Sequence, residues 1–288
     1  MAEPVTWTAA NVAGCLHVPT AGDDKYSRGV VGIQTGSDAY PGAAVLGVEA
    51  AWRTGTGMVR YLGPARELVM ARRPETVTAD GRVQAWLVGS GTDAAARPRA
   101  LADKLREIVA GSLPVVVDAG ALDAAVGAAA PVVVTPHARE HEKLRAALGL
   151  GESGTDRIAA AHETAAALGG TVLLKGAETI VTTPSGWTAR IDSGTPWLAT
   201  AGTGDVLGGV LGAVVAGAQG RAEASGDAVD AEALGPLAAT AAWLHGRAGV
   251  IAALRAGGGM PGPVTALDVA EALPEAVAEA SRTQQSPR

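Results

Sequence analysis

The segment Ala201-Gly202-Thr203-Gly204-Asp205 runs directly into the apolar stretch Val206-Leu207-Gly208-Gly209-Val210-Leu211-Gly212-Ala213-Val214-Val215-Ala216-Gly217. So uniform an apolar run predicts a buried helix. The unpaired backbone N–H groups of such a helix gather at its first turn, where the helix dipole is positive. Glycines let a bound anion approach those groups closely. The sequence therefore predicts an anion site at residues 202–204.

Asp205 is an unexpected neighbour for this site, because a bound anion repels a carboxylate. One interpretation is that Asp205 caps the helix, a role worth about 1 kcal/mol. The other is that it accepts the proton of a hydroxyl group that attacks phosphorus. Capping alone does not explain why glycines flank Thr203 on both sides. We therefore favour Asp205 as a catalytic base, with Gly202, Thr203 and Gly204 beside the phosphates.

Length and composition limit the class of protein. The chain has 288 residues, a net charge of −6 and no basic cluster, which argues against a nucleic-acid partner. Cys15 is the only cysteine, so disulfides and cysteine-based zinc sites are excluded. Without a linker or a fixed-period repeat, residues 1–288 are expected to form a single domain. Residues from about 281 to 288 are expected to be a flexible tail.

A membrane location is not expected. The first residues lack a basic segment followed by an apolar core, so we predict no signal peptide. The longest weakly polar run, 206–218, is shorter than the roughly 20 residues that a membrane span needs. The expectation is a cytoplasmic protein with no membrane partner.

Short apolar runs alternate with helical patterns along most of the chain. Strands are expected at 29–34, 57–62, 85–88, 114–118, 131–134 and 171–175. Helices are expected at about 7–12, 41–54, 95–110, near 122, 135–148, 155–169, from 205, at 229–255 and at 264–282. Residues 178–191 indicate an appended hairpin. This alternation predicts an α/β fold, with a mostly parallel sheet covered by helices on both faces.

Polar or glycine residues follow five of the expected strands, and ligands of such sheets bind beyond the carboxyl ends of the strands. The five segments are Gly36-Ser37, Gly89-Ser90-Gly91, Asp118, Thr135-Pro136-His137 and Lys175-Gly176. Each alone has an ordinary explanation: a turn glycine, a helix cap at Asp118 or at Thr135 with Pro136 in the first helical position, or a structural histidine. Together they predict one crevice that the 202–205 loop closes.

The chemistry of this crevice suits phosphoryl transfer to or from a nucleotide. It combines a cation at Lys175, an imidazole at His137, the carboxylate of Asp205 and backbone amides. The chain has no Gly-x-x-x-x-Gly-Lys-Ser/Thr loop, which excludes a P-loop. It also lacks a Gly-x-Gly-x-x-Gly fingerprint after its first expected sheet strand, which disfavours a redox Rossmann domain.

Several motifs, in order, resemble the ADP-dependent NAD(P)H-hydrate dehydratases of the ribokinase-like superfamily. They are Gly-Ser-x-x-Tyr-Pro-Gly-Ala-Ala (36–44), Arg-Thr-Gly-Thr-Gly (53–57), Gly-Ser-Gly (89–91), Val-Asp-Ala-Gly-Ala-Leu (117–122), Thr-Pro-His-x-x-Glu (135–140), Leu-Lys-Gly-Ala-Glu-Thr (174–179) and Ala-Gly-Thr-Gly-Asp-Val-Leu-Gly-Gly (201–209). The resemblance implies a three-layer ribokinase-like fold. It also implies a lyase that repairs the S epimer of hydrated NADH or NADPH, while ADP becomes AMP and phosphate.

The resemblance also implies roles for individual residues. Ala43, Gly91, His137 and Asp205 would contact the hydrated nucleotide, and Asp205 would act on its hydroxyl. Lys175, Gly176, Ala177, Glu178 and Thr179 would line the ADP pocket, with Gly202, Thr203 and Gly204 on the phosphates. Mg²⁺ is expected as a cofactor, although no acidic pair in the sequence identifies its ligands. A homotetramer and a separate epimerase as functional partner are also expected.

The chain departs from the family pattern at four places. Ser90 stands where Gly-Pro-Gly is usual, Ala138-Arg139 where Pro-Gly is usual, Gly120 where a second acid is common, and 195–199 where Asn-Gly-Met-Ala is usual. Two other functions therefore stay open. One is an ATP-dependent small-molecule kinase of the same superfamily, and the other is a nucleotide-binding protein without catalysis.

Overall fold

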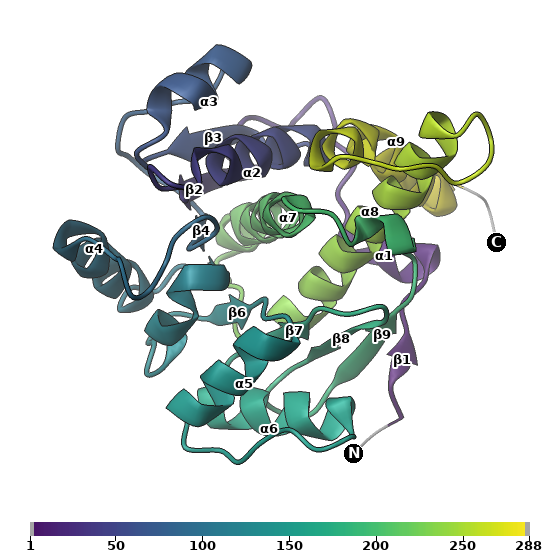
Figure 1. Ribbon diagram of the computed structural model, residues 1–288. Helices are drawn as coiled ribbons and strands as arrows, with labels where there is room; N and C mark the ends of the chain where they lie inside the picture. Colours follow the sequence, from purple (N-terminus) through teal and green to yellow (C-terminus); the bar gives the residue numbers. More distant parts are fainter. Residues whose placement is uncertain (1–2, 286–288) are drawn as a thin grey trace.

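The computed structural model describes residues 3–285 and contains one nine-stranded sheet (Figure 1). The strand order is β1-β9-β8-β7-β6-β5-β4-β2-β3. The strands are β1 (Val5–Thr6), β2 (Val30–Gln34), β3 (Met58–Tyr61), β4 (Ala85–Val88), β5 (Val115–Val117), β6 (Val132–Val134), β7 (Thr171–Leu174), β8 (Thr179–Thr182) and β9 (Thr188–Ile191). Strands β2 to β7 are parallel neighbours, whereas β8 is antiparallel to both β7 and β9. The predicted parallel sheet and appended hairpin are confirmed.

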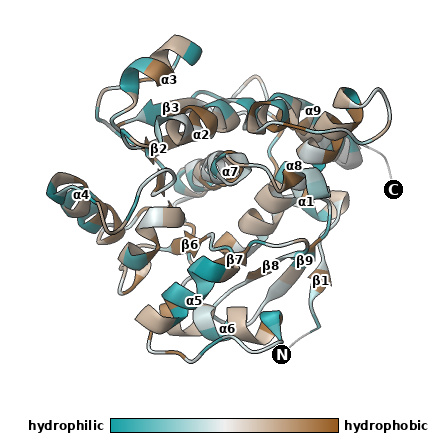
Figure 2. Cartoon of the chain, in the orientation of Figure 1, coloured by the Kyte–Doolittle hydropathy of each residue, from teal (hydrophilic) through white to brown (hydrophobic). Residues whose placement is uncertain are grey.

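Successive residues of the central strands pack into two different hydrophobic clusters. Val115 and Val117 join one cluster, while Val116 between them joins the other. This alternation follows from the two-residue repeat of a strand, whose side chains point to opposite faces of the sheet. Both faces are therefore buried, as the uniformly apolar strands predicted. In Figure 2 the strands β6, β7 and β8 are hydrophobic, whereas the outer helix α5 is hydrophilic.

Helices cover both faces of the sheet. One layer contains α4 (Arg99–Val109), α5 (Ala138–Ala147) and α6 (Arg157–Leu168), which share a cluster with the outward valines of β5 and β6. The other face is covered by α1 (Ala9–Cys15), α2 (Pro41–Thr54), α7 (Thr203–Ser225), α8 (Leu234–Ala256) and α9 (Ala266–Gln285). Helix α7 lies in the middle of this layer, packed against both α2 and α8 (Figure 1). The three-layer arrangement is confirmed.

The apolar helix α8 is a core element of this layer. It is long and apolar enough to span a membrane by length and composition, but 78% of its most apolar window is buried inside the protein. Among residues 3–285 no other helix meets these criteria. Its apolar character is explained by packing against α7, α9 and β9.

The structure corrects several predicted boundaries. Helix α7 begins at Thr203 rather than at Asp205, and α8 begins at Leu234 rather than near 229. Helix α9 continues to Gln285, so the tail predicted from 281 is helical over 281–285; residues 286–288 lie outside the described part. Three elements were not predicted: β1, the short helix α3 (Arg66–Arg72) and the 3₁₀ turn η2 (Pro196–Leu198).

Candidate functional site

Asp118 is the centre of a buried polar cluster at the carboxyl ends of the parallel strands. It follows β5 directly and is 3% exposed. Its carboxylate accepts hydrogen bonds from the hydroxyls of Ser90, at 2.9 Å, and Thr135, at 2.6 Å. The ammonium of Lys175 lies 3.1 Å from the same carboxylate. The loops after β4, β5, β6 and β7 therefore meet in one crevice.

The backbone that follows Asp118 is unusual. Ala119 has a φ of 46°, the only positive φ of a non-glycine residue within 3–285, and a left-handed alanine is a strained conformation. It opens the 3₁₀ helix η1 (Ala119–Ala125). A Cβ atom on Gly120 would lie 2.1 Å from the carbonyl oxygen of Thr92. This overlap explains why glycine stands where the resemblance suggests a second acid.

Lys175 carries the positive charge of the crevice. Burial favours a neutral amine, but the carboxylates of Asp118, Glu140 and Asp205 outweigh it and raise the pKa of Lys175. Glu140 lies 3.7 Å from the Lys175 ammonium. The lysine therefore stays charged and can attract phosphate oxygens.

Asp205 occupies the third position of α7, whose N-cap is Gly202. Among the described residues, its carboxylate has no hydrogen-bond partner and makes no capping bond. Burial and the negative charge of Asp118 raise the pKa of Asp205 to about 6, against the opposing effect of Lys175. The capping interpretation is thus not supported, and the raised pKa suits a general base near neutral pH.

The N-cap position of α7 requires glycine. Gly202 has a φ of 89°, and a Cβ there would lie 2.6 Å from the side chain of Leu46 on α2. A Cβ on Gly204 would face the Lys175 ammonium at 3.8 Å. The hydroxyl of Thr203 donates to the carbonyl of Leu198, so this side chain fixes the loop itself. The first turn of α7 and the ammonium of Lys175 are therefore close neighbours.

Segment 195–199, which departs from the family pattern, folds into η2 beside this loop. The side chain of Leu198 packs against Gly249 of α8. A Cβ added to Gly249 would lie 2.6 Å from that side chain. Trp197 is 41% exposed, and its carbonyl accepts the hydroxyl of Thr200. The altered residues therefore support the backbone of the glycine loop from the α8 side.

Ala43 and Gly91 lie against each other on the β2 side of the crevice. Gly91 has a φ of 67°, and a Cβ there would lie 2.4 Å from the Cβ of Ala43 and 2.9 Å from the carbonyl oxygen of Tyr40. The N-terminus of α2 therefore packs directly onto the loop after β4. These two predicted substrate contacts form a continuous wall with no room for larger side chains.

The start of α5 differs from the prediction. His137 is the N-cap, not Thr135, and Pro136 precedes the helix rather than opening it. The Nδ1 atom of His137 accepts the backbone N–H groups of Arg139 and Glu140, and Glu140 accepts the N–H of His137 in return. Thr135 is drawn away from this role because its hydroxyl donates to Asp118. The His137 ring is half-exposed, and its Nε2 lies 3.6 Å from the Glu140 carboxylate.

The predicted ADP segment 175–179 forms the connection between β7 and β8. Arg157, the first residue of α6, donates to the carbonyls of Lys175 and Glu178 at 3.3 and 3.1 Å. The carboxylate of Glu178 is engaged by Arg190 on β9 at 2.6 Å. Gly176 and Ala177 are exposed between them. Lys175 thus points into the crevice while Glu178 faces the hairpin.

A metal site built from protein ligands alone does not fit this crevice. Within residues 3–285, no group of three or more His, Cys, Asp or Glu side chains is arranged to hold a metal ion. Asp118 already accepts two hydroxyls and faces Lys175. Mg²⁺ often binds through one or two carboxylates and substrate phosphates. We therefore assign it no protein site.

Comparisons with known proteins agree with this geometry. The family model of NAD(P)H-hydrate dehydratase matches residues 31–274. The chain is 44% identical over 231 residues to the bifunctional NAD(P)H-hydrate repair enzyme of Mycobacterium tuberculosis, covering 75% of this chain and 47% of that protein. The chain belongs to the NAD(P)H-hydrate dehydratase family.

Other relatives of this dehydratase family differ in length. The chain spans about half the length of the bifunctional relatives that it matches, 47% for the mycobacterial one. It is 34% identical over 245 residues to the ADP-dependent (S)-NAD(P)H-hydrate dehydratase of Neisseria meningitidis, covering 78% of this chain and 77% of that one. The solved ADP/ATP-dependent NAD(P)H-hydrate dehydratase of Bacillus subtilis has a TM-score of 0.78, 24% identity and coverage of 97% and 100%. That likeness supports the fold, including its ribokinase-like architecture.

Three residues of this dehydratase-family crevice were not recognised as functional in the sequence. The sequence predicts Asp118 and Ser90 only as members of the crevice, with a helix cap and a turn as their ordinary explanations. Glu140 belonged to a motif but had no role. Their contacts join residues 17 to 57 positions apart, which no local pattern reveals. The available signal was that all of them follow strand ends or open the next helix.

Proposed function

We propose that this protein dehydrates the S epimer of hydrated NADH or NADPH and consumes ADP as the phosphate donor, giving AMP and phosphate. Membership of the dehydratase family supports the reaction class. The observation that carries the proposal is Asp205, a partly buried carboxylate without a hydrogen-bond partner in the described chain, beside Lys175 and the first amides of α7. A base, a cation and an amide nest are what phosphoryl transfer to a hydroxyl requires.

The first step transfers a phosphoryl group to the hydrate. Asp205 accepts the proton of the hydroxyl at C6 of the nicotinamide ring, and the oxygen attacks the β-phosphorus of ADP. The P–O bond to AMP breaks, and AMP leaves with its electron pair. Lys175 and the amides at residues 202–204 stabilise the negative charge on the transferred group. Mg²⁺ would arrive on the nucleotide phosphates, and no step here depends on it.

The second step removes the phosphate. Hydroxide is a poor leaving group, and phosphorylation makes the C6 oxygen a good one. The lone pair of the ring nitrogen forms a double bond to C6 while phosphate departs with the C–O electrons. Loss of a proton from C5 then creates the C5–C6 double bond and returns the lone pair to nitrogen. A site of kinase architecture would thus serve a lyase.

The two substrates would occupy opposite sides of Asp205. Segment 175–179 and the loop at residues 202–204 would hold ADP. Ala43, Gly91 and His137 would hold the hydrate. Sheet order supports this division for Ala43 and Gly91, because the loops after β2 and β4 lie on one side of Asp118 and the loop after β7 lies on the other. His137 follows β6 and lies on the β7 side. The nucleotide and its acceptor would then meet at Lys175.

The test is a product analysis with each donor. Purified protein is mixed with S hydrate and either ADP or ATP, and NADH or NADPH, adenine nucleotides and phosphate are measured. The proposal expects NADH, AMP and phosphate in equal amounts with ADP. A phosphorylated product that keeps its phosphate would instead indicate a kinase of the same superfamily. Tight nucleotide binding without turnover of any hydrate would indicate a non-catalytic binding protein.

Assembly and partners are part of the same proposal. A homotetramer and a separate epimerase that interconverts the R and S hydrates remain predictions from the family resemblance. Sedimentation of the purified protein tests the first. The second is tested by adding an epimerase to a mixed R and S hydrate preparation, which should raise the converted fraction from about half to nearly all.

A further inference from the structure

Helix α8 supports the segment of chain that leads into α7, and it packs against both α7 and the turn η2. A Cβ on Gly246 would lie 2.4 Å from the Oγ atom of Ser193. The hydroxyl of Ser193 in turn donates to the carbonyl of Trp243 at 3.1 Å. One turn further along, Gly249 is in contact with the side chain of Leu198. Since residues three apart share one side of a helix, a single side of α8 holds this segment.

Thr203 connects this supported segment to α7. Its hydroxyl lies 2.8 Å from the carbonyl oxygen of Leu198 and 2.9 Å from that of Thr200, and it donates to them. Thr203 is also the first residue of α7, two residues before Asp205. Contacts around Thr203 therefore determine where the first amides of α7 and the Asp205 carboxylate lie.

His245 is a residue of α8 that reaches Thr203 directly. Its ring interacts with the backbone of Thr203, and this interaction raises the pKa of His245. The backbone group is therefore an acceptor, which identifies it as the carbonyl oxygen. His245 is partly buried, and its buried Nε2 atom makes no hydrogen bond within residues 3–285. Because an apolar side chain would fill this place without an unpaired polar atom, packing alone does not explain the imidazole.

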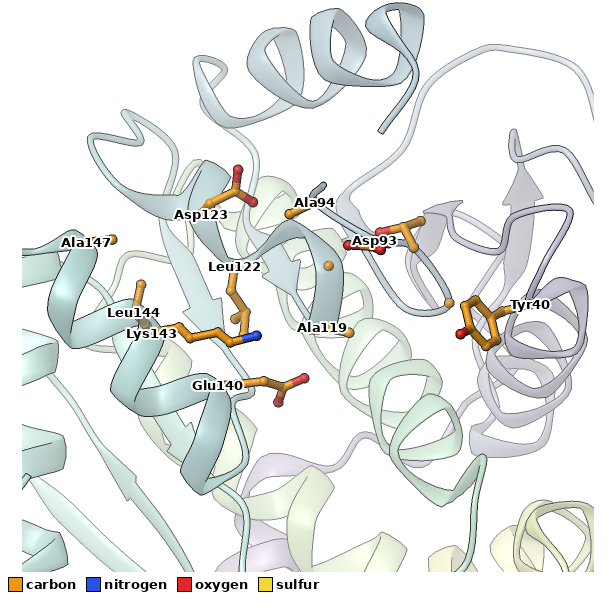
Figure 3. Close-up of a pocket in the computed structure, with 13 residues that line it drawn as sticks. Tyr40, Asp93, Ala94, Ala119, Leu122, Asp123, Glu140, Lys143, Leu144 and Ala147 are labelled. Carbon is orange, nitrogen blue, oxygen red and sulfur yellow. The ribbon is translucent and has the colours of Figure 1, made fainter. Parts of the chain in front are cut away.

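His245 lies apart from the open side of the crevice. There a cavity of about 480 Å³ opens, with Tyr40 and Glu140 projecting from opposite walls (Figure 3). His245 is not one of the residues that line this cavity. A hydrate held there would not contact the histidine, so an effect of His245 on its conversion would pass through α7.

The ring of His245 is neutral at neutral pH. Burial lowers the pKa of His245 to about 4, and the positive charge of Lys175 acts in the same direction, against the effect of the Thr203 backbone. A neutral imidazole has one N–H donor and one acceptor nitrogen. It can donate to a carbonyl without adding a second cation beside Lys175. Because this pKa is far from neutral, His245 is not suited to be the general acid or base.

We propose that His245 is a positioning residue, whose neutral imidazole holds the backbone of Thr203 and so fixes the first amides of α7 and the Asp205 carboxylate around the phosphates of the nucleotide. The inference rests on the proposed function for the identity of that nucleotide. It gives His245 no contact with the reacting atoms. Its effect should disappear when the side chain cannot form hydrogen bonds and should return with a neutral amide.

The test compares His245→Leu with two amide variants, His245→Asn and His245→Gln, which present a donor near one or the other ring nitrogen. Calorimetric titration measures ADP affinity, and the formation of NADH from hydrate measures kcat. In His245→Leu, ADP affinity should fall about tenfold and kcat about 10- to 100-fold, because the reacting groups are misplaced. At least one amide variant should restore both values to within about threefold of the unmodified protein.

Thr240→Val is the matched control. Thr240 lies on the same helix and is buried, and its hydroxyl also has no hydrogen-bond partner in the described chain. The control should leave ADP affinity and kcat unchanged. Normal values of both in folded His245→Leu would overturn the proposal, and so would a loss that neither amide variant restores.

Nitrogen-15 NMR of the unmodified protein, labelled on its histidine rings, is a check that does not depend on the folding of His245→Leu. The His245 signals are those missing from an amide variant. They should show a neutral ring at pH 6 and should move when ADP is added. Signals that are the same with and without ADP would contradict the proposal.

ADP affinity is measured without turnover, so the two proposals can fail separately. A protein whose ADP affinity depends on His245 in this way but that converts no hydrate would disprove the proposed function. The role of His245 in holding the phosphate loop would then still stand.

Discussion

Two carboxylates of this protein, one fully buried and one partly buried, have opposite surroundings. Glu49, on α2, is fully buried and pairs with Arg53, Arg72 and Arg73. Burial alone would raise its pKa, but the guanidinium groups of Arg73 and Arg53 outweigh burial and lower the pKa of Glu49 to about 2. Asp205, on α7, has no hydrogen-bond partner in the described chain, and its pKa is raised to about 6.

This difference distinguishes a carboxylate that stabilises the fold, Glu49, from one that is suited to the reaction, Asp205. Glu49 joins α2 to the short helix α3, and its charge is fully compensated. The Asp205 carboxylate is stabilised only at a distance by Lys175 and is opposed by Asp118. A carboxylate left in such an environment takes up a proton readily near neutral pH. The comparison predicts that losing Asp205 affects rate and losing Glu49 affects stability.

The largest effect is expected for Asp205→Asn. The amide cannot accept the hydroxyl proton, so kcat should fall by about 10²–10⁴. The formation of NADH from hydrate and ADP measures it. The folded protein should not lose stability, because a poorly solvated charge is removed. Near-normal turnover in this variant would remove the catalytic assignment.

Glu49→Gln should show the opposite pattern. It leaves three arginines without their shared carboxylate and should lower the free energy of unfolding by about 3 kcal/mol. Denaturant unfolding measures this loss, while kcat of the folded variant should stay close to normal. Glu275→Gln is the control, since its exposed pair with Arg255 should contribute less than about 1 kcal/mol.

The pH dependence of this loss has a defined sign. The pKa of Glu49 is lowered from 4.5 to about 2, so its stabilisation is complete above pH 4.5 and disappears as the pH falls toward 2. The difference between the unmodified protein and Glu49→Gln should shrink over that window. A difference that stays constant would show that the ion pairs are not its source.

Lys175→Ala tests the cation that Asp118 and Asp205 share. Loss of the ammonium should weaken ADP binding about 10- to 100-fold, since a charge-assisted contact to phosphate is removed. Calorimetric titration with ADP measures this, with Lys25→Ala as the control on an exposed turn. An unchanged ADP affinity would count against a phosphate-binding role.

Ser90→Ala should have the smallest effect. It removes one of the two hydroxyl donors of Asp118, at a cost of about 1 kcal/mol in unfolding free energy. Thr135 and Lys175 still hold the carboxylate, so kcat should fall only a few-fold. A loss of rate as large as that of Asp205→Asn would mean that Asp118 itself takes part in proton transfer.

The layers of the fold were predictable because its strands are buried on both faces. Runs such as Val115–Val117 are continuous and apolar, and Pro41 marks the first turn of α2. Helix α3 was missed because it is short and is secured by ion pairs of Arg72 and Arg73 with Glu49, more than 20 residues away. The local sequence of α3 does not reveal these ion pairs.

The site was predictable in its position but not in its contacts. Strand ends located the crevice, and the glycine loop located Asp205. The capping of α5 was predicted wrongly because threonine and proline have the stronger N-terminal preferences. The hydroxyl of Thr135 donates a hydrogen bond to Asp118. The ring of His137 therefore accepts the N-terminal amides of α5 instead. That competition arises only after β5 and β6 are paired.

The dependence of kcat/KM on pH tests the central claim most directly. Asp205 must be ionised to accept a proton, so activity should be full above its pKa of about 6 and should fall as the pH drops below it. The account predicts an acid limb with an apparent pKa near 6 that disappears from the residual activity of Asp205→Asn. A limb near 4, or one that persists unchanged in the variant, would contradict it.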